Sequence, residues 1–361
     1  MKKYVAMIVV FLIVFGGQEA YSQMNRRHIK KNNRRISSYR GKKYGFGPEK
    51  RYNTIGISLN ALNYYGDLAP KPSRLSTDIT FTRPAIGVSF THRFGPRYQL
   101  TAAFTYGTLK GSDAESADPA DAGNGAYRYV RNLSFRNRIK ELSVVASFDL
   151  FENMATYISR VKWTPYVFAG ASIFHHNPQA QAPATDLLGN PLPNAGEWVD
   201  LQPLGTEGQH SDQQDGDANQ GTKPYHRLQV ALPVGIGARF RLNEVIDISA
   251  EIGFRYLFTD YIDDVSKDYV DLNKLDSELA KAMSYRSNEV TPTTEPVSNI
   301  MANRYVYPTG GYDVVAGFGH VNSSGEARFN NRGDNDKDIF MVTTIRVTYI
   351  LGKTFHRAKF R

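Results

Sequence analysis

The sequence of 361 residues contains no cysteine. This absence excludes disulfide bonds, thiol catalysis and the acylated cysteine that anchors bacterial lipoproteins. If the chain is held in a membrane, its fold must hold it there.

Long apolar runs are also missing. Outside the N-terminal segment, no run approaches the about 20 residues that a membrane helix requires, which argues against a helical membrane protein. The N-terminal segment has two lysines after the first methionine, an apolar core over residues 4–15, and the small residues Ala20 and Ser22. This order is typical of a secretory signal peptide, so we expect residues 1–22 to be removed on export. The alternative is an uncleaved anchor helix, for which the core is short.

Acidic residues are nearly absent from residues 23–51, where eleven lysines and arginines accompany the single Glu49. Because few apolar residues lie among them, we expect a disordered basic tail on the periplasmic side. An exported tail meets little nucleic acid, so its partners would be acidic proteins, phosphate-bearing lipids or cell-wall polymers. The alternative is a solvated spacer. The candidate partner-binding residues are Arg26, Arg27, Lys30, Lys31, Arg34, Arg35, Arg40, Lys42 and Lys43.

Residues 246–258 show the pattern on which the fold prediction depends. Apolar and polar side chains alternate, and only Leu257 breaks the alternation. The stretch is longer than the about 5–6 residues of an ordinary strand and suits a tilted strand that crosses a bilayer, which needs about 9–11. If the apolar face meets lipid, then Asp247, Glu251 and Arg255 point into a polar lumen. A soluble barrel with its apolar face inward is the alternative.

Seven further stretches show related alternation. The expected strands are residues 54–63, 85–94 and 98–108, a fourth ending at 150, and residues 163–174, 228–240, 246–258 and 339–351. The connections after the first, third, fifth and seventh strands are long, and the others are shorter. Outer-membrane barrels have an even number of strands, long loops outside the cell and short periplasmic turns.

The face opposite the apolar one is rich in small residues, which suit the crowded interior of an eight-stranded barrel. These residues are Gly56, Ser58, Gly87, Ser89, Gly235 and Gly237. We therefore predict an all-β fold over residues 52–361. It is an eight-stranded antiparallel transmembrane β-barrel with long extracellular loops, one of them carrying a short helix, and with both termini in the periplasm.

Charged residues are expected to line this lumen, where an isolated charge would be costly. We predict that they form ion pairs that plug the barrel rather than an ion pathway, with Arg255 pairing with a carboxylate such as Glu251. The residues expected to form these pairs are Glu141, Asp149, Arg239, Glu251, Arg255 and Arg346.

The sequence contains no HExxH, GxSxG or phosphate-binding loop. The aspartates of residues 334–338 have calcium-like spacing, but Ile339 stands where an EF-hand needs glycine. We therefore expect no enzyme activity, no metal site and no cofactor. The alternative, a hydrolase at the barrel rim, would have to use His175, His176, His210, Asp212, Asp215, Asp217, Asp260, Asp263 and Asp264.

The segment of residues 259–266, TDYIDDVS, has a structural interpretation. Asp260 can cap the end of the strand or the turn, while Ile262 and Val265 pack within the loop. In residues 272–285, four apolar residues recur at helical spacing. This pattern predicts an ordered helical lid over the barrel that needs no ligand.

Several segments resemble a known family, the PorG-type outer-membrane barrels of Bacteroidota. The similarity covers roughly residue 52 to the C-terminus and is sharpest in two parts. These are TDYIDDVS, whose signature residues are Asp260, Tyr261, Asp263 and Asp264, and residues 272–289, which end in SYRSNE. The segments that carry it are SFRNRIKEL (134–142), TPYVFAGASIF (164–174), LPVGIGARF (232–240) and FRYLFTDYIDDVSKDYVD (254–271).

The resemblance implies a non-enzymatic component of the gliding-associated type IX secretion system. It also implies a place in the outer membrane among its lipids, and partners in the periplasmic ring, which is built from a lipoprotein and its companion protein. A general structural barrel is the alternative. Many outer-membrane barrels end on an aromatic residue, whereas this sequence ends in Arg361, so we expect Tyr349, Phe355 or Phe360 to serve as the assembly signal.

Overall fold

The computed structural model describes residues 46–68, 81–307, 309–317, 330–334 and 336–351. The predicted signal peptide, most of the basic tail, Phe355 and Phe360 lie outside the described residues. The chain divides into two compact units, Met1–Gly47 and Pro48–Arg361, and the fold below is that of the second. Among the described residues, no helix is long and apolar enough to span a bilayer.

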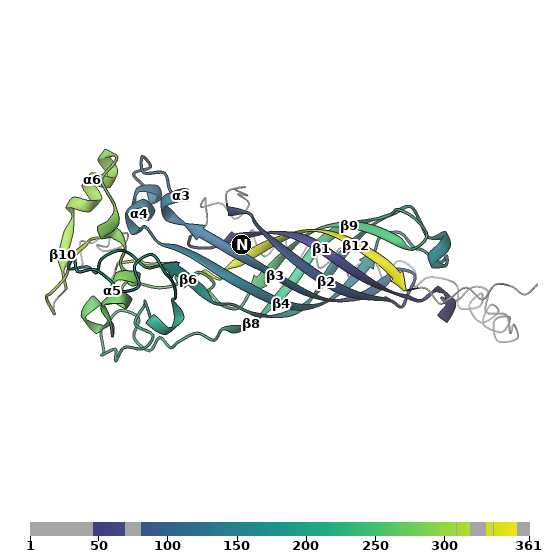
Figure 1. Ribbon diagram of the computed structural model, residues 1–361, viewed down its shortest axis with the longest axis horizontal. Coiled ribbons are helices and arrows are strands. Elements are labelled where there is room, and N and C mark those ends of the chain that lie inside the picture. The colour runs from purple at the N-terminus through teal and green to yellow at the C-terminus, as the bar shows by residue number, and fades with distance from the viewer. Residues whose placement is uncertain (1–45, 69–80, 308, 318–329, 335, 352–361) are drawn as a thin grey trace, which may run out of the picture. The chain divides into compact units, whose positions relative to one another are not determined.

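Eight long strands form a closed antiparallel barrel (Figure 1). They are β1 (Tyr52–Tyr65), β2 (Arg83–Arg93), β3 (Tyr98–Ser112), β4 (Ser134–Asp149), β5 (Trp163–His175), β8 (Leu228–Arg241), β9 (Ile246–Leu257) and β12 (Ile339–Leu351). Each strand pairs with the next along the chain, and β12 pairs back with β1 from Asn53↔Leu351 to Tyr65↔Ile339. Because an open sheet edge cannot be hydrogen-bonded in lipid, a transmembrane sheet requires this closure.

The apolar face of the barrel points outward. In β9 the side chains of Ile252 and Tyr256 are 47% and 49% exposed, whereas those of Asp247 and Glu251 are 2% and 9% exposed. This is the reverse of a soluble barrel and is the arrangement of a transmembrane one, so the predicted fold class is confirmed. An aromatic girdle marks the turn end of the barrel and includes Tyr98, Phe151, Trp163, Phe240 and Tyr349.

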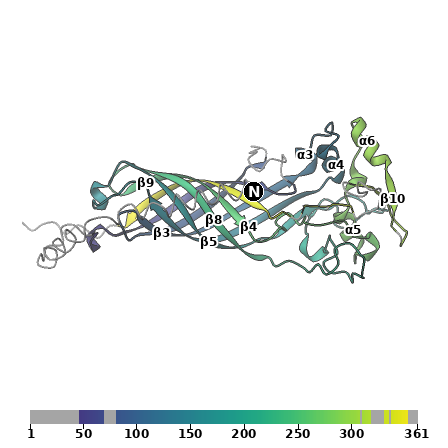
Figure 2. The ribbon, with the colours of Figure 1, turned by 180° about the vertical axis from the view of Figure 1, so that it is seen from behind.

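Short connections lie at one end of the barrel and long ones at the other (Figures 1 and 2). The short connections comprise residues 94–97, 150–162 and 242–245, and the second contains the 3-10 turn η4 (Tyr157–Ser159). Because Asn53 pairs with Leu351, the chain enters and leaves the barrel at the turn end. Another 3-10 turn, η2 (Pro48–Lys50), precedes β1.

More than one loop carries helices, so the prediction of a single helical loop was wrong. The helices are α3 (Asp113–Ser116), α4 (Asn124–Arg131), α5 (Glu278–Ser284) and α6 (Glu295–Ala302). Helix α4 was missed because its apolar residues are few, yet Ala126 and Val130 pack against Val297 and Ile300 of α6. The packing of the two loops together thus supplies what the local sequence pattern lacks.

The predicted helix over residues 272–285 is divided into a 3-10 turn, η6 (Leu272–Lys274), and α5. The division occurs because the hydroxyl of Ser277 caps α5 by accepting a hydrogen bond from the amide of Ala280. The remaining elements of the loop end are β6 (Pro178–Gln181), β7 (Trp198–Asp200), η5 (Gln202–Leu204), η7 (Ser287–Glu289), β10 (Arg304–Val306) and β11 (Asp313–Val315).

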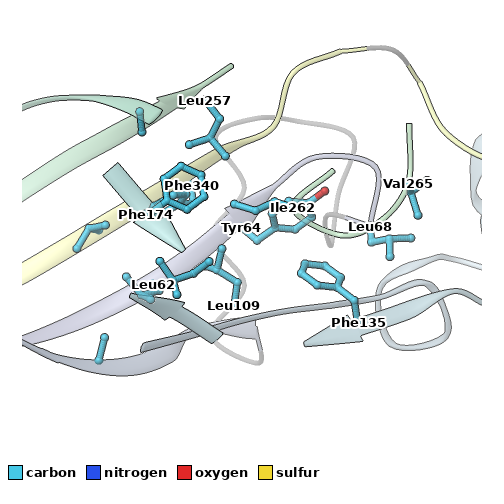
Figure 3. Close-up of a cluster of buried hydrophobic side chains, with 14 of the residues drawn as sticks. Leu62, Tyr64, Leu68, Leu109, Phe135, Phe174, Leu257, Ile262, Val265 and Phe340 are labelled. Atoms are coloured by element: carbon cyan, nitrogen blue, oxygen red, sulfur yellow. The ribbon is translucent and has the colours of Figure 1, made fainter. Parts of the chain in front are cut away.

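An apolar plug fills the lumen at the loop end (Figure 3). It comprises Leu62, Tyr64, Leu68, Ala85, Leu109, Leu133, Phe135, Ile139, Phe174, Ala231, Leu257, Ile262, Val265, Phe340 and Val342. The sequence predicted a polar lumen, but at the loop end the lumen is apolar. Leu257, which breaks the alternation of β9, points into this plug and is only 4% exposed.

Further toward the turn end, aromatic rings fill the space that small residues leave. A β-carbon added at Gly235 would lie 2.5 Å from the ring of Phe168, and one at Gly237 would lie 2.6 Å from the ring of Tyr166. Both distances are shorter than real side chains allow, so these two glycines are required by close packing against the rings of the neighbouring strand β5.

Candidate functional site

The turn half of the lumen is built around charged side chains. Asp149 on β4 accepts hydrogen bonds from Arg93 Nη1 at 3.0 Å, Arg239 Nη1 at 3.3 Å and Gln99 Nε2 at 3.1 Å. One buried carboxylate therefore joins β2, β3 and β8 across the barrel. Arg93 was not among the ion-pairing residues that the sequence predicted.

A second group forms around Glu251. Arg346 Nη1 and Nη2 donate to its two carboxylate oxygens at 2.9 and 3.0 Å, and the hydroxyl of Tyr166 donates to Oε1 at 2.6 Å. This two-pronged geometry is the strongest form of an arginine–carboxylate pair.

The expected pairing of Arg255 with Glu251 was wrong. Arg255 Nε lies 3.1 Å from Glu141 Oε1, on the opposite strand β4. Two residues four positions apart on a strand are separated by about 13 Å, whereas the narrow lumen brings facing strands within reach of a side chain.

A further ion pair closes the turn end. Arg160 Nε lies 3.0 Å from Asp247 Oδ1, and its guanidinium also donates to the carbonyl oxygens of Asn243 and Ile246. Arg160 belongs to the connector between β4 and β5, outside any strand pattern, so no feature of the sequence indicated it.

These side chains leave little free space. Two cavities lined by the lumen residues have volumes of about 20 and about 10 Å³. Each has room for about one water molecule. With the apolar plug beyond them, the described lumen has no continuous aqueous path.

A cluster of carboxylates lies at the mouth of the barrel, above the apolar plug. We call it the carboxylate cluster; its members are Asp67, Glu207, Asp260, Asp263, Asp264 and Asp338. All except Asp67 are at most 9% exposed. Asp67 follows β1, residues 260–264 follow β9, Asp338 precedes β12, and Glu207 comes from the long loop after β5.

The phenol of Tyr64 links two members of this cluster. Its oxygen lies 2.6 Å from Asp263 Oδ2 and 2.8 Å from Asp338 Oδ1. A phenol has one proton to donate. At least one of the two carboxyls must therefore carry a proton if both contacts are hydrogen bonds.

Arg332 is the cation at the centre of the cluster and is 2% exposed. Its Nη1 donates to Glu207 Oε1 at 2.9 Å and to the carbonyl oxygen of Asp264 at 2.5 Å. The same oxygen of Glu207 accepts the backbone amides of Ser266 and Lys267 at 2.9 and 3.1 Å. Arg332 and Glu207 thus tie the two longest loops together, although neither residue was singled out from the sequence.

Burial raises the pKa of every aspartate in the cluster. For Asp260 the pKa rises to about 9, because of burial first and the nearby Asp338 second. For Asp264 it rises to about 6, since Arg332 opposes the effect of burial. The pKa values of Asp67, Asp263 and Asp338 are raised by burial as well. Several of these carboxyls therefore hold protons at neutral pH.

The predicted signature residues all lie in or beside this cluster. The hydroxyl of Ser266 donates to Asp260 Oδ2 at 2.7 Å, and Tyr225 donates to Asp264 Oδ1 at 2.7 Å. The ring of Tyr261 stacks on Tyr225 with 4.8 Å between the ring centroids. Their contacts anchor the loop ends to the barrel mouth.

The three histidines available to a rim hydrolase lie in different environments, while Asp260, Asp263 and Asp264 belong to the carboxylate cluster. His176 is buried beside Asn137 and the carbonyl of His226, whereas His175 is exposed on the outer face of β5 and His210 bonds the carbonyl of Gln202. Within the described residues, no group of three or more His, Cys, Asp or Glu side chains has an arrangement that could hold a metal ion.

A family model described as "Domain of unknown function (DUF6089)" matches residues 47–186, which contain β1 to β6. No curated protein matches the chain. Similar solved structures include Ail of Yersinia pestis in complex with the heparin analogue sucrose octasulfate (7% identity, TM-score 0.33, covering 84% of this chain and 99% of Ail). Neisserial surface protein A has 8% identity and a TM-score of 0.33, and the match covers 82% of this chain and 96% of that protein. OprG from Pseudomonas aeruginosa has 8% identity and a TM-score of 0.34, and the match covers 86% of this chain and 100% of OprG. With TM-scores this low, the barrel assignment depends on the strand pairing described above.

The ion pair across the lumen gives a first prediction. Replacing Arg255→Leu leaves Glu141 buried without a cation, so we expect the free energy of unfolding to fall by about 3–5 kcal/mol. Urea unfolding of the barrel in lipid vesicles, followed by the gel mobility of unboiled samples, measures this loss. The double variant Glu141→Leu/Arg255→Leu removes both charges and should be more stable than the single variant. A double variant that loses the sum of the two single effects would show that the side chains do not interact.

The carboxylate cluster predicts a pH dependence. Its carboxyls have a higher pKa in the folded protein than the usual 3.8, so the folded state favours their protonated form. Their stabilising contribution is complete below pH 3.8 and is lost as pH rises through about 6 for Asp264 and about 9 for Asp260. Limited proteolysis of the loops should therefore be faster near pH 9 than near pH 6.

The variant Asp260→Asn/Asp263→Asn keeps the side-chain shapes and cannot ionise at these positions, so its loops should stay protected at the higher pH. Asp212→Asn/Asp276→Asn, at two exposed positions, is the matched control and should behave like the unmodified protein. Equal cleavage of the unmodified protein at both pH values would contradict the prediction.

Proposed function

We propose that the protein is a non-enzymatic outer-membrane barrel that acts by binding other proteins, as a docking component of a type IX protein-secretion complex. The observation that carries this proposal is the blocked lumen. A barrel whose interior holds ion pairs, aromatic rings and an apolar plug has only its outer surface, loops and turns available for function.

The loop end supports the same interpretation. Glu207, Arg332 and the carboxylate cluster join the two longest loops to the ends of β1, β9 and β12. The described loops therefore form a cap with its own buried polar and apolar packing rather than a set of open surface loops. Such a cap is suited to presenting a fixed surface.

The basic tail of residues 26–43 is the proposed site for the periplasmic ring. Its cations would attract an acidic surface over a screening length of about 8 Å at physiological salt. The resemblance of residues 259–266 to the secretion barrels suggests this role. The alternative is a general structural barrel, which would need no partner.

The blocked lumen predicts the absence of conductance. The purified protein in a planar lipid bilayer should give no stable current steps, because charged pairs and the apolar plug exclude a continuous water path. The double variant Arg93→Ala/Arg239→Ala serves as the comparison. Its lumen is wider beside Asp149, but its apolar plug remains in place, so this variant should also give no current steps. Stable current steps from the unmodified protein would show that the lumen conducts.

The proposed docking role predicts that the tail can be removed without affecting the folding of the barrel. Deletion of residues 26–43 should leave the barrel folded and inserted, but should reduce co-purification of the periplasmic ring proteins and impair secretion. The contact should weaken as salt rises, because it depends on charge. A matched variant with the same segment's lysines and arginines changed to glutamine separates charge from length. If the truncated barrel retains the ring at every salt concentration, then the tail is a spacer and the dock lies at the turns near Gly95, Glu152 or Asn243.

A further inference from the structure

The charges on the outer face of the barrel are of one sign. All carboxylates of the eight barrel strands point into the lumen: Glu141, Asp149, Asp247 and Glu251. The only lysines and arginines at outward-facing positions of these strands are Lys110 on β3 and Arg136, Arg138 and Lys140 on β4. We call these four residues the basic strip.

The basic strip lies directly above the apolar belt, on the loop side. Along β4 and the residue that follows it, the outward belt runs from Leu142, which is 50% exposed, to Leu150, which is 46% exposed. At about 3.4 Å per residue and a tilt of about 40°, this span covers roughly 20 Å of membrane thickness, close to the about 25 Å of an outer-membrane barrel. Lys140 therefore lies at the border of the belt. Figure 1 shows β3 and β4 running toward α3 and α4 at the loop end.

The two upper members of the strip are held by neighbouring side chains. Lys110 Nζ lies 2.7 Å from Glu115 Oε1. Arg136 donates to Gln179 Oε1 at 3.1 Å, and its guanidinium lies 3.7 Å from the ring centroid of Trp198. These contacts hold both side chains on the outer face of the barrel.

The two lower members are different. Arg138 and Lys140 are exposed, and within the described residues neither has a hydrogen bond or an ion pair from its side chain. Lys140 lies opposite Tyr106 of β3 and His175 of β5, which are also exposed. Two cations without partners thus lie where lipid headgroups meet the barrel.

We infer that Arg138 and Lys140, with Lys110 and Arg136 above them, bind the phosphate-bearing headgroup of a lipid in the leaflet at the loop end. The cations face sideways, in the same direction as the belt below them. A bound lipid can therefore place its phosphate on Arg138 and Lys140 and its acyl chains along Leu142 and Ile173. A soluble acidic protein would have to enter the headgroup region to reach the same side chains.

Only the identity of the lipid rests on the proposed outer-membrane location. With the long loops outside the cell, the lipid is a phosphorylated glycolipid of the outer leaflet. The arrangement of cations above an apolar belt itself comes from the barrel geometry.

The test uses the full chain in nanodiscs of phosphatidylcholine that contain a small fraction of diphosphorylated lipid A. Native mass spectrometry counts the lipid A molecules that stay with the barrel when it is released. We expect retention by the unmodified protein. The variant Arg138→Gln/Lys140→Gln should bind about 25-fold more weakly, or about five-fold for each cation removed. The exchange Arg138→Lys/Lys140→Arg keeps both charges and should keep binding.

The matched control is Arg51→Gln/Lys162→Gln, which removes two exposed cations near the turn end and should retain lipid A normally. Excess inorganic phosphate should not displace the lipid, because the belt holds the acyl chains; displacement by phosphate alone would overturn the lipid assignment. Equal retention by Arg138→Gln/Lys140→Gln and the unmodified protein would overturn the headgroup site and leave the docking proposal intact. Failure of the unmodified protein to insert would overturn the membrane location and the headgroup site together.

Discussion

Hydrocarbon accepts no hydrogen bonds, and the rest of this structure depends on that constraint. Every backbone amide and carbonyl of a strand that crosses the bilayer must find its partner within the protein. Here the pairing of β12 with β1, from Asn53↔Leu351 to Tyr65↔Ile339, supplies the partners that the first and last strands would otherwise lack. Once eight strands are closed in this way, the interior is only wide enough for side chains. The contents of the lumen then decide what the barrel can do.

Charge in such a narrow lumen has to be paired, because the surroundings cannot solvate it. The pairs run between strands rather than along one strand, and three of them span at least one intervening strand: Arg93 and Arg239 with Asp149, and Arg255 with Glu141. Each of these three pairs links strands that are not direct neighbours and occupies space that water would need. The glycines beside Tyr166 and Phe168 serve the same end, since they admit the rings that fill the remaining width. The result is a blocked barrel, which is why we propose that its function lies on its outer surface, loops and turns.

The sequence predicted the strands well because lipid outside and charge inside impose a strict alternation. It also placed all six expected lumen charges on the correct face. It did not predict their partners, because alternation defines a face but not which residues meet across the lumen. Arg160, Glu207 and Arg332 come from connections with no periodic pattern, and their roles arise only when distant segments meet. One signal was present: Leu257 broke the alternation of β9 at the level where the apolar plug begins.

The plug and the carboxylate cluster above it explain how a mouth rich in acids can remain closed. Below the cluster, the side chains of Ile262 and Val265 pack into the plug and remove the loop ends from water. Burial then disfavours ionised carboxylates, and protons shared through Tyr64 replace the cations that the cluster lacks. Arg332 balances part of the remaining charge from above. The acids of the barrel strands and of the carboxylate cluster therefore lie inside, in the lumen and at its mouth, while the strand cations that face outward lie at the border of the apolar belt and above it. The outer face of the barrel strands therefore carries no carboxylate that would repel an anionic headgroup, as the proposed lipid site requires.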